Sequence, residues 1–376
     1  MALDVSAAGT PGRGRLALVV PGDVAAPTGG NVWDRRVRDG LAEVGVDVAW
    51  YPVDGAWPSP APRERRALER VLAALPDTSS VLLDGLVACG VPDVVAAHRS
   101  RLRLGVVVHL PLALETGTDP EVAARLDAGE RRVLADVDVV VVTSRWTASL
   151  LGGHGLARPP VVALPGTEPP SRTGSDPAAP VQPYATEAGS HLLCLGALSP
   201  RKGQRLLLRA LAGLPGQTPG PADPPGWSAR FVGPQPDPVE AADLLRERDE
   251  ADLAGRVQVL PPLVDDALEE QWRWADLLVV PSHVESFGMV VTEALARGRP
   301  VLATTGGALP EALGTTGSGP PGLLVPPGGA AALQQALERW LGDAGLREEL
   351  RRRALERSSG LDGWDCTARA VAAAFA

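Results

Sequence analysis

The sequence predicts an α/β protein with two doubly wound, Rossmann-like domains that face each other across a cleft. Its 376 residues are more than one compact domain usually contains. Short apolar runs rich in β-branched residues alternate with helical stretches up to residue 165, and the alternation starts again at residue 191. The runs are continuously apolar, which is typical of strands in a parallel sheet covered on both faces.

The first half of the chain is predicted to be an N-terminal domain of residues 1–170. A helix is expected over 31–44, and strands are expected at 15–20, 46–51, 80–85, 103–110, 136–144 and 161–165. Residues 171–190 lie in a stretch rich in Pro, Gly, Ser and Thr without an apolar period, so they are predicted to be a linker.

The second half is predicted to be a C-terminal domain of residues 191–358. Strands are expected at 191–196, 227–233, 256–261, 276–281, 300–304 and 322–326. Helices are expected at 204–212, 239–252, 268–274, 289–297 and 331–341, and flexible loops at 214–226 and 314–322. Residues 359–376 are expected to form a last helix that packs back toward the N-terminal domain, because its apolar face needs a partner.

The composition argues against several classes of protein. A net charge of −9 argues against nucleic acid as the main partner. No apolar run reaches the 18 residues of a membrane-spanning helix, and the first residues lack the pattern of a signal peptide. Three widely separated cysteines indicate reduced thiols in a cytoplasmic protein.

Two weaker patterns in the sequence have simpler interpretations. Asp136 and Asp138 match a D-x-D metal motif by letter, but they precede a strand, whereas such a motif follows one; no metal site is predicted. The amphipathic stretch 63–75 could contact a membrane surface, but a helix that faces the core is the favoured interpretation, because acidic residues dilute its charge.

The most informative segment is 276–311, in which a strand, a loop, a helix and a second strand follow one another directly. The loop contains Glu285, and the helix, which is expected to open at Phe287–Gly288, contains Glu293. The N-terminus of a helix favours phosphate, and carboxylates accept hydrogen bonds from hydroxyls. A helix end flanked by two carboxylates therefore suits the diphosphate and the hydroxyls of a nucleotide sugar.

Lys202 is the single lysine among 36 basic residues. Arginine is acceptable at every other basic position, so this position is a candidate for a compact ammonium charge, although one lysine can also survive by chance. Gly29 and Gly30 follow the first strand and precede a helix, where they form either a plain turn or a phosphate loop. His109 ends a buried strand, as either a core residue or a site residue; His283 is predicted only to shape its loop.

The segment ESFGMVVTEALARGRPVLATTGG (285–307) resembles the signature of the group 1 (family 4) glycosyltransferases, which have the GT-B fold. The similarity continues in LGALSPRKGQ (195–204), TGG (28–30), VVHLPL (107–112) and GWDCTAR (363–369). It therefore covers nearly the whole chain, and the segment around Glu285 is its most specific part.

The resemblance implies roles for the residues of this segment. Glu285 is expected to contact hydroxyls of the donor sugar, and Glu293 to accept a hydrogen bond from the nucleotide ribose. Backbone N–H groups around Phe287, Gly288 and Met289 are expected to meet the sugar or the phosphate.

The resemblance also implies roles outside this segment. Lys202 is expected to neutralise the diphosphate, with the loop of Gly29 and Gly30 nearby, and His109 to lie near the donor sugar. The family often has an arginine five residues before the lysine, where this chain has Ala197. Arg201 is one candidate to replace it, and a solvated arginine at a helix start is the other interpretation.

The resulting expectation is a retaining glycosyltransferase without metal or cofactor. A nucleotide-diphosphate sugar is the expected donor, bound by the C-terminal domain. The N-terminal domain is expected to present a small-molecule, glycan or lipid-linked acceptor. Two alternatives stay open: a nucleotide-sugar epimerase of the same fold, and a non-catalytic protein that only binds nucleotide sugar.

Overall fold

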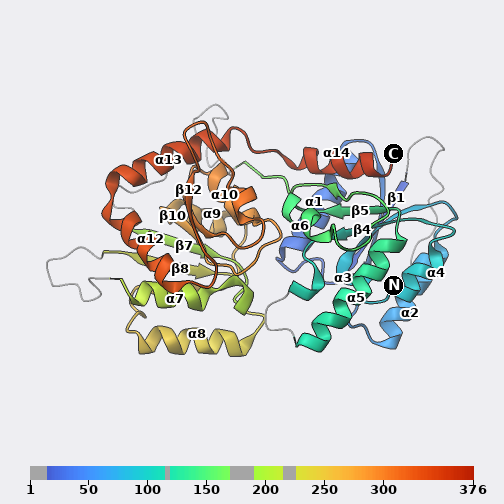
Figure 1. Cartoon of the computed structure of the whole chain (residues 1–376), viewed down its shortest axis with the longest axis horizontal. Helices are drawn as coiled ribbons and strands as arrows, with labels where there is room; N and C mark the ends of the chain where they lie inside the picture. The colour runs from blue at the N-terminus through green and yellow to red at the C-terminus, as the bar shows by residue number, and fades with distance from the viewer. Residues whose placement is uncertain (1–14, 115–118, 170–189, 215–225) are drawn as a thin grey trace.

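The predicted fold class is confirmed by the computed structural model, which contains two six-stranded parallel sheets with helices between the strands. The structure describes residues 15–114, 119–169, 190–214 and 226–376. Figure 1 shows the two sheets in separate halves that lie side by side. The predicted linker 171–190 lies outside the described residues except for its last residue, and so does most of the predicted loop 214–226.

The N-terminal sheet has the strand order β2-β1-β3-β4-β5-β6, and all its pairs are parallel. Its strands are β1 (Arg15–Pro21), β2 (Asp47–Val53), β3 (Ser80–Asp84), β4 (Arg103–Val108), β5 (Val139–Val142) and β6 (Val161–Val162). Its helices are α1 (Gly29–Glu43), α2 (Pro62–Ala74), α3 (Gly85–Cys89), α4 (Pro92–His98), η1 (Leu112–Leu114), α5 (Pro120–Asp136) and α6 (Arg145–Leu151).

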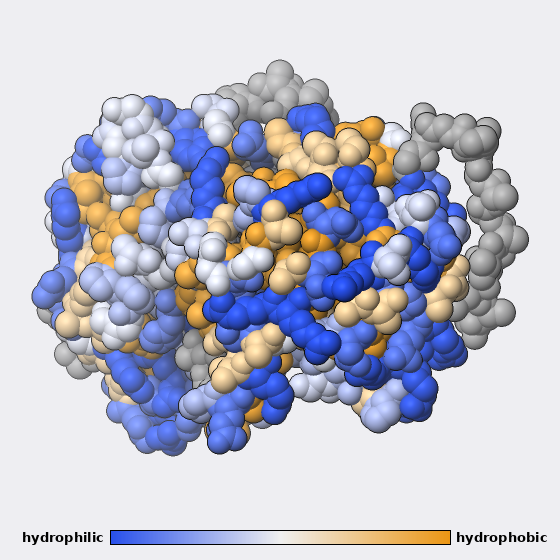
Figure 2. Space-filling model, turned by 45° about the vertical axis from the view of Figure 1, so that its right-hand side comes forward, coloured by the Kyte–Doolittle hydropathy of each residue, from blue (hydrophilic) through white to orange (hydrophobic). Residues whose placement is uncertain are grey.

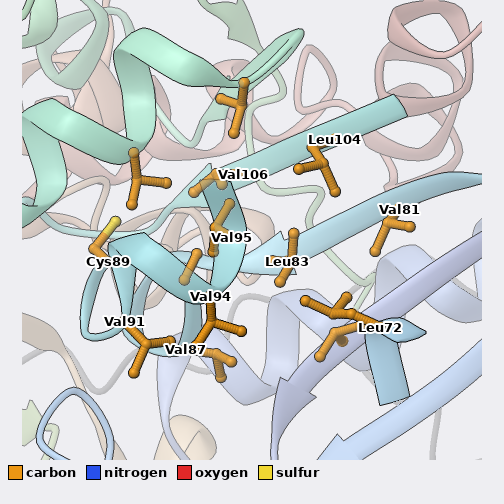
Figure 3. Packing of buried hydrophobic residues seen from close by; sticks show 14 of the residues in the cluster. Leu72, Val81, Leu83, Val87, Cys89, Val91, Val94, Val95, Leu104 and Val106 are labelled. Atoms are coloured by element: carbon orange, nitrogen blue, oxygen red, sulfur yellow. The ribbon is translucent and has the colours of Figure 1, made fainter. Parts of the chain in front are cut away.

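Both faces of this sheet are covered by apolar side chains. Leu83 and its neighbour Leu82 on β3 belong to different buried clusters, because successive residues of a strand point to opposite faces. Figure 3 shows the first cluster, in which strand residues such as Leu83 and Leu104 meet Val94 and Cys89 from the helices. This two-sided burial is the reason why the strands read as unbroken apolar runs.

The C-terminal sheet has the strand order β12-β11-β10-β7-β8-β9. Its strands are β7 (His191–Leu195), β8 (Ser228–Val232), β9 (Val257–Leu260), β10 (Leu277–Val280), β11 (Val301–Thr304) and β12 (Gly322–Val325). Its helices are η2 (Pro200–Lys202), α7 (Gln204–Ala212), α8 (Pro238–Glu250), α9 (Asp265–Trp274), α10 (Met289–Ala296), α11 (Leu309–Leu313), α12 (Ala330–Gly342) and α13 (Ala344–Ser358). Strands β8 and β9 follow on one side of β7, whereas β10, β11 and β12 follow on the other side, so the strand order reverses between β7 and β10. Ligands of such sheets bind where the strand order reverses.

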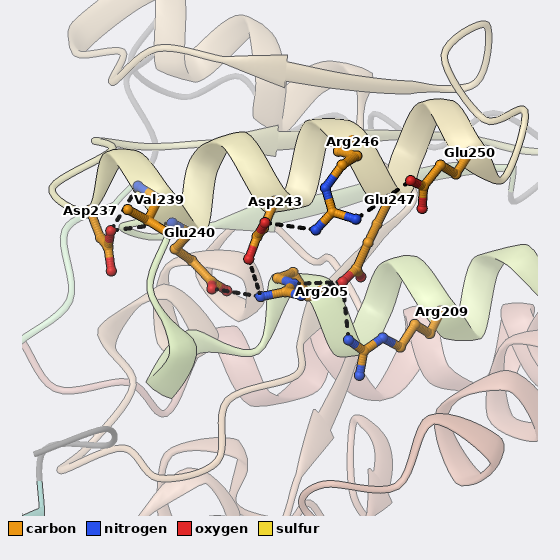
Figure 4. Close-up of polar contacts among 9 residues, drawn as sticks. All are labelled: Arg205, Arg209, Asp237, Val239, Glu240, Asp243, Arg246, Glu247 and Glu250. Carbon is orange, nitrogen blue, oxygen red and sulfur yellow. Dashed lines mark hydrogen bonds and ion pairs between the residues drawn. The ribbon is translucent and has the colours of Figure 1, made fainter.

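A set of ion pairs joins α7 to α8 on the outside of this sheet (Figure 4). The Arg205 guanidinium lies 3.1 Å from a carboxylate oxygen of Glu240 and 3.2 Å from one of Asp243, and it also contacts Glu247. Other side chains of α7 and α8 are buried beside these ion pairs, so the ion pairs help to fix how α8 packs against α7.

The last helix, α14 (Trp364–Ala374), packs against α1 of the N-terminal half. Ala368 and Val371 of α14 are buried together with Val37 and Leu41 of α1. Figure 1 shows α14 lying over the N-terminal half, apart from the helices that precede it in the chain. The end of the chain thus joins the two halves.

The structure differs from the expectations at 136–144 and at 344–358, and it shows the shape of the expected loop at 314–322. The strand expected at 136–144 begins only at Val139, because Asp136 ends α5 and the Asp138 carboxylate accepts from the Leu104 N–H at 2.9 Å. The expected loop 314–322 contains a tight turn that the Glu356 carboxylate holds through Gly317. Helix α13 was not expected at all.

The surface shown in Figure 2 has hydrophilic and hydrophobic residues interspersed. No helix in the described part of the chain combines the length and the apolar character that crossing a bilayer requires.

Candidate functional site

The loop between β10 and α10 is shaped by a glycine that no other residue could replace without strain. Gly288 has φ +94°, and a Cβ placed there would come within 2.7 Å of Leu309. Helix α10 starts at the next residue and has no side-chain cap at its N-terminus. Phe287 is buried in the core, so only its backbone is available to a ligand. The first N–H groups of α10 therefore have no competing side chain.

Glu285 lies in this loop and is 5% exposed. Its Oε1 accepts from the Lys202 Nζ at 2.6 Å and from the Ser282 hydroxyl at 2.7 Å. Its backbone is fixed as well, because its carbonyl accepts from the Ala308 N–H at 2.8 Å. The carboxylate is thus held in one position, and its Oε2 lies 3.5 Å from the Arg201 guanidinium, its one contact of this kind among the described residues.

Lys202 reaches Glu285 because the turn after β7 packs directly on the loop after β10. The His283 N–H donates to the Arg201 carbonyl at 2.8 Å. Gly203 has φ +71°, and a Cβ there would lie 2.4 Å from the Pro281 carbonyl oxygen, so the two turns touch at their backbones. Two residues 83 positions apart in the chain therefore form a short ion pair.

Electrostatics keep Glu285 ionised. Burial by itself raises the pKa of its carboxyl, but the charges of Lys202 and Arg201 outweigh burial and hold the pKa below its usual range. The Arg201 guanidinium also donates to the Val284 carbonyl at 3.2 Å, which turns this arginine toward the loop. Lys202 is the more compact charge at the site, and its side chain is 21% exposed.

Glu293 lies one turn into α10, and its surroundings differ from those of Glu285. Burial is the main cause that raises the pKa of its carboxyl, with Arg297 opposing and Glu168 adding to the shift. The Arg297 guanidinium is bound to the Glu269 carboxylate and to the Glu293 backbone carbonyl. Within the described residues, no hydrogen bond to the Glu293 carboxylate is recorded, so its oxygens are available to a donor.

The N-terminus of α1 meets the N-terminus of α10 across the two halves. Helix α1 begins at Gly29, where a Cβ would lie 3.4 Å from the Met289 side chain. At Gly30, a Cβ would lie 3.3 Å from the His109 ring. The structure thus brings Gly29, Gly30, His109 and Met289 together at the carboxyl ends of β1, β4 and β10.

His109 follows β4, which ends at Val108, and its ring is held by two acidic residues that sequence reasoning missed. Its Nε2 lies 3.2 Å from Asp34 Oδ1 and 3.3 Å from Asp84 Oδ2. Burial lowers the pKa of the imidazole, but the two carboxylates outweigh it and raise the pKa to about 10. Asp84 ends a buried strand, which is a signal that could have identified it; Asp34, in the middle of α1, gave none.

Asp34, Asp84 and His109 could also surround a cation, because their ligand atoms all lie within 4.8 Å of one another. In the described part of the chain, this is the group of acidic and histidine side chains with that spacing. A proton on Nε2 accounts for the same spacing, since both carboxylate oxygens lie at hydrogen-bonding distance from that nitrogen.

Glu311 on α11 joins the two halves, and sequence reasoning missed it too. Its Oε2 accepts from the backbone N–H groups of Arg145 at 2.9 Å and Trp146 at 3.2 Å, and its Oε1 from the Arg145 guanidinium at 3.1 Å. Glu311 therefore caps the start of α6 from the opposite half. An acidic residue soon after Gly306-Gly307 was the available signal.

Comparisons with known proteins give a consistent result. A family model described as "Glycosyl transferases group 1" matches residues 184–357. The chain is 32% identical to a D-inositol 3-phosphate glycosyltransferase from Actinosynnema mirum, over 76% of this chain and 67% of that protein. It is 31% identical to one from Streptomyces bingchenggensis, over 75% of this chain and 63% of that protein. Further curated relatives of this name are matched over 50% to 61% of their length.

Solved structures agree in fold. A sucrose-phosphate synthase from Thermosynechococcus elongatus superimposes with a TM-score of 0.74 at 23% identity, over 96% of this chain and 98% of that chain. The Anabaena protein HepE, solved in complex with UDP and glucose, gives a TM-score of 0.68 at 19% identity, over 97% of this chain and 99% of that chain.

Proposed function

The chain belongs to the group 1 glycosyltransferases, and on that basis we propose that it transfers a sugar from a nucleotide-diphosphate donor with retention of configuration and without a metal. The donor would bind the C-terminal half, and the acceptor would meet it from the N-terminal half. One observation carries the proposal: the only lysine of the chain lies 2.6 Å from the buried Glu285 carboxylate, beside a helix N-terminus without a side-chain cap.

Glu285 and Glu293 would recognise hydroxyl groups. A carboxylate has room for about four hydrogen bonds, and two of those at Glu285 go to Lys202 and Ser282 on Oε1. Its Oε2, which lies 3.5 Å from Arg201, keeps room for a hydroxyl of the donor sugar. Glu293 would accept from the ribose, because this half-buried residue lies one turn into α10 and its carboxylate forms no hydrogen bond within the described residues.

The leaving diphosphate would be stabilised by charges already in place. Lys202, the N-terminus of α10 and the loop of Gly29 and Gly30 would surround the oxygens that gain negative charge as the glycosidic bond breaks. The acceptor would attack from the same side as the leaving group, and a phosphate oxygen would take its proton. This route needs no nucleophile from the protein.

Ala197 stands where the family often has an arginine, and we propose that Lys202 carries most of the missing charge. Arg201 is engaged with the Val284 carbonyl and lies 3.5 Å from Glu285. It would support the carboxylate more than the diphosphate.

The relatives suggest the first substrates to test. Those in the comparison are named D-inositol 3-phosphate glycosyltransferases, and HepE was solved with UDP and glucose. We propose a uridine-diphosphate sugar as donor and a cyclic polyol, free or phosphorylated, as acceptor.

A donor screen followed by a transfer assay tests this function. Thermal shift with UDP, GDP, ADP and their sugars identifies the donor, and mass spectrometry then detects transfer to inositol phosphates, with and without a chelator. NMR of the anomeric proton decides between retention and inversion. An isomerised sugar nucleotide formed without acceptor would indicate an epimerase instead. Donor binding without turnover on any acceptor would indicate a binding protein.

A further inference from the structure

The His109 ring is held by residues from separate elements of the N-terminal half. Asp34 comes from α1 and Asp84 from the end of β3, while His109 follows β4. Asp34 and Asp84 are 4% and 3% exposed, so two carboxylates are buried around one nitrogen. Trp33 packs edge-on against the ring, with 5.3 Å between the centroids. Buried carboxylates need donors, and the ring supplies one.

The hydrogen bonds decide which ring nitrogen faces inward. Asp84 Oδ1 accepts from the Leu86 N–H at 2.6 Å, which fixes this carboxylate as the cap of α3 and turns its Oδ2 to the His109 Nε2. A flipped ring would place a carbon against both carboxylates and leave them without this donor. Asp34 Oδ2 already lacks a hydrogen-bond partner. If Oδ1 also lost its hydrogen bond to His109, the whole Asp34 carboxylate would be unsatisfied.

The other nitrogen, Nδ1, forms no hydrogen bond within the described residues. It is not fully buried, and the ring keeps 18% exposure. The ring lies against Gly30, next to Gly29, which approaches the first residue of α10. The ring therefore lies at the junction where the donor is proposed to bind, with its Cδ2 side against Gly30 and Nδ1 on its other side.

We propose that Asp34 and Asp84 are positioning residues that hold Nε2 of His109 inward, so that Nδ1 is presented to an oxygen of the bound sugar nucleotide. The identity of that ligand rests on the proposed function, whereas the orientation of the ring does not. Two carboxylates on Nε2 also favour a proton on both nitrogens, which makes Nδ1–H a charged hydrogen-bond donor.

The charged groups that act on the ring are Asp34 and Asp84, and Arg35 acts in turn on Asp34. Burial raises the pKa of Asp34 to about 6 despite the opposing charge of His109, so the Asp34 carboxyl is ionised above that pH. With the Asp34 carboxylate ionised and the Asp84 carboxylate oxygen also at Nε2, the imidazole is expected to stay protonated well past neutrality. Below pH 6, protonation of Asp34 would loosen the ring.

The test is NMR of the imidazole nitrogens in the full chain, labelled with ¹⁵N-histidine. The chain has five histidines, and His109→Gln assigns the signal. In the unchanged protein, both His109 nitrogens are expected to carry protons at pH 8. Asp34→Asn and Asp84→Asn are expected to bring deprotonation below that pH, and an asparagine at 84 can still cap α3. Asp39→Asn is the matched control, because that α1 carboxylate pairs only with Arg38 among the described residues.

Turnover gives a second readout. Both variants are expected to lose about tenfold to a hundredfold in kcat at pH 8, the range of one charged hydrogen bond, and to recover part of it at lower pH. If Asp84→Asn does not fold, Asp34→Asn alone decides. An unchanged His109 titration in both variants would overturn the proposal, as would ring signals that shift on adding Mg²⁺ or Zn²⁺, which would indicate a cation site. If the NMR result holds but no sugar is transferred, only the proposed function fails.

Discussion

Replacing Lys202 by alanine is expected to impair both stability and turnover, and its effect on stability should depend on pH. The ion pair with Glu285 spans 2.6 Å, and the two side chains are 21% and 7% exposed. Removing the ammonium leaves a buried carboxylate with Ser282 and with Arg201 at 3.5 Å.

The magnitude follows from the geometry. At 2.6 Å the gross attraction is about 6 kcal/mol for an effective dielectric constant of about 20. Desolvation of both charges offsets most of this attraction. Breaking a buried pair from one side nevertheless costs about 3–5 kcal/mol, because the remaining charge is uncompensated. Arg201 still compensates part of the charge, so a loss of about 3 kcal/mol in the free energy of unfolding is expected at pH 7.5.

The sign of the pH dependence can be derived from the shifts. In the unchanged protein the pKa of Glu285 is lowered, so its contribution to stability is present above the unfolded pKa and is lost as pH falls through the folded pKa. Without Lys202, burial dominates and the folded pKa rises above the unfolded one. The free energy of unfolding of the variant is then lowered at neutral pH, and part of this loss disappears as Glu285 takes up a proton. The stability difference between the two proteins should therefore shrink as pH falls.

Urea unfolding of the unchanged protein, Lys202→Ala, Glu285→Gln and the double variant, at pH 7.5 and pH 5, measures this effect. Glu285→Gln is the matched control, since it removes the charge and keeps the shape. The double variant should be more stable than the two single losses predict, because neither charge is left alone. Turnover of Lys202→Ala should fall by about 10²–10³, in line with the loss of one preorganised charge. Additive losses of stability, or the same loss at both pH values, would refute the ion-pair argument; near-normal sugar transfer would refute the role at the diphosphate.

Three further predictions address other parts of the site. Glu293→Ala should weaken nucleotide binding by about tenfold without unfolding the protein, because one hydrogen bond to a charged group is lost; calorimetry with an unchanged affinity would contradict it. Glu311→Ala removes the cap that Arg145 and Trp146 receive across the halves, so small-angle scattering should show a larger radius of gyration and the donor KM should rise, whereas an unchanged radius and KM would argue against a joining role. Gly288→Ala should cost about 1–3 kcal/mol, because φ is +94° and Leu309 lies in the way; a melting temperature equal to that of the unchanged protein would contradict it.

The sequence alone was sufficient for the architecture. Continuous apolar runs rich in β-branched residues, such as 139–142, are typical of strands covered on both faces, and their alternation with helices predicts parallel sheets. Local chemistry also predicted the loop of Glu285, because the strand, the glycine at 288 and the helix follow one another within a few residues. These features depend on short-range geometry, which the order of residues contains directly.

The contacts that assemble the site were decided by the tertiary structure. Lys202 meets Glu285 because β7 and β10 are neighbours in the sheet although they are far apart in the chain. Asp34 and Asp84 meet at His109 only because β1, β3 and β4 lie side by side with α1 above them. A sequence pattern shows which segments are strands but not the order of the strands in the sheet. It therefore predicts which charged residues lie at strand ends, but not which of them contact one another. The strand order and the packing of the two halves determine these contacts, because a buried charge is stable only where a partner reaches it.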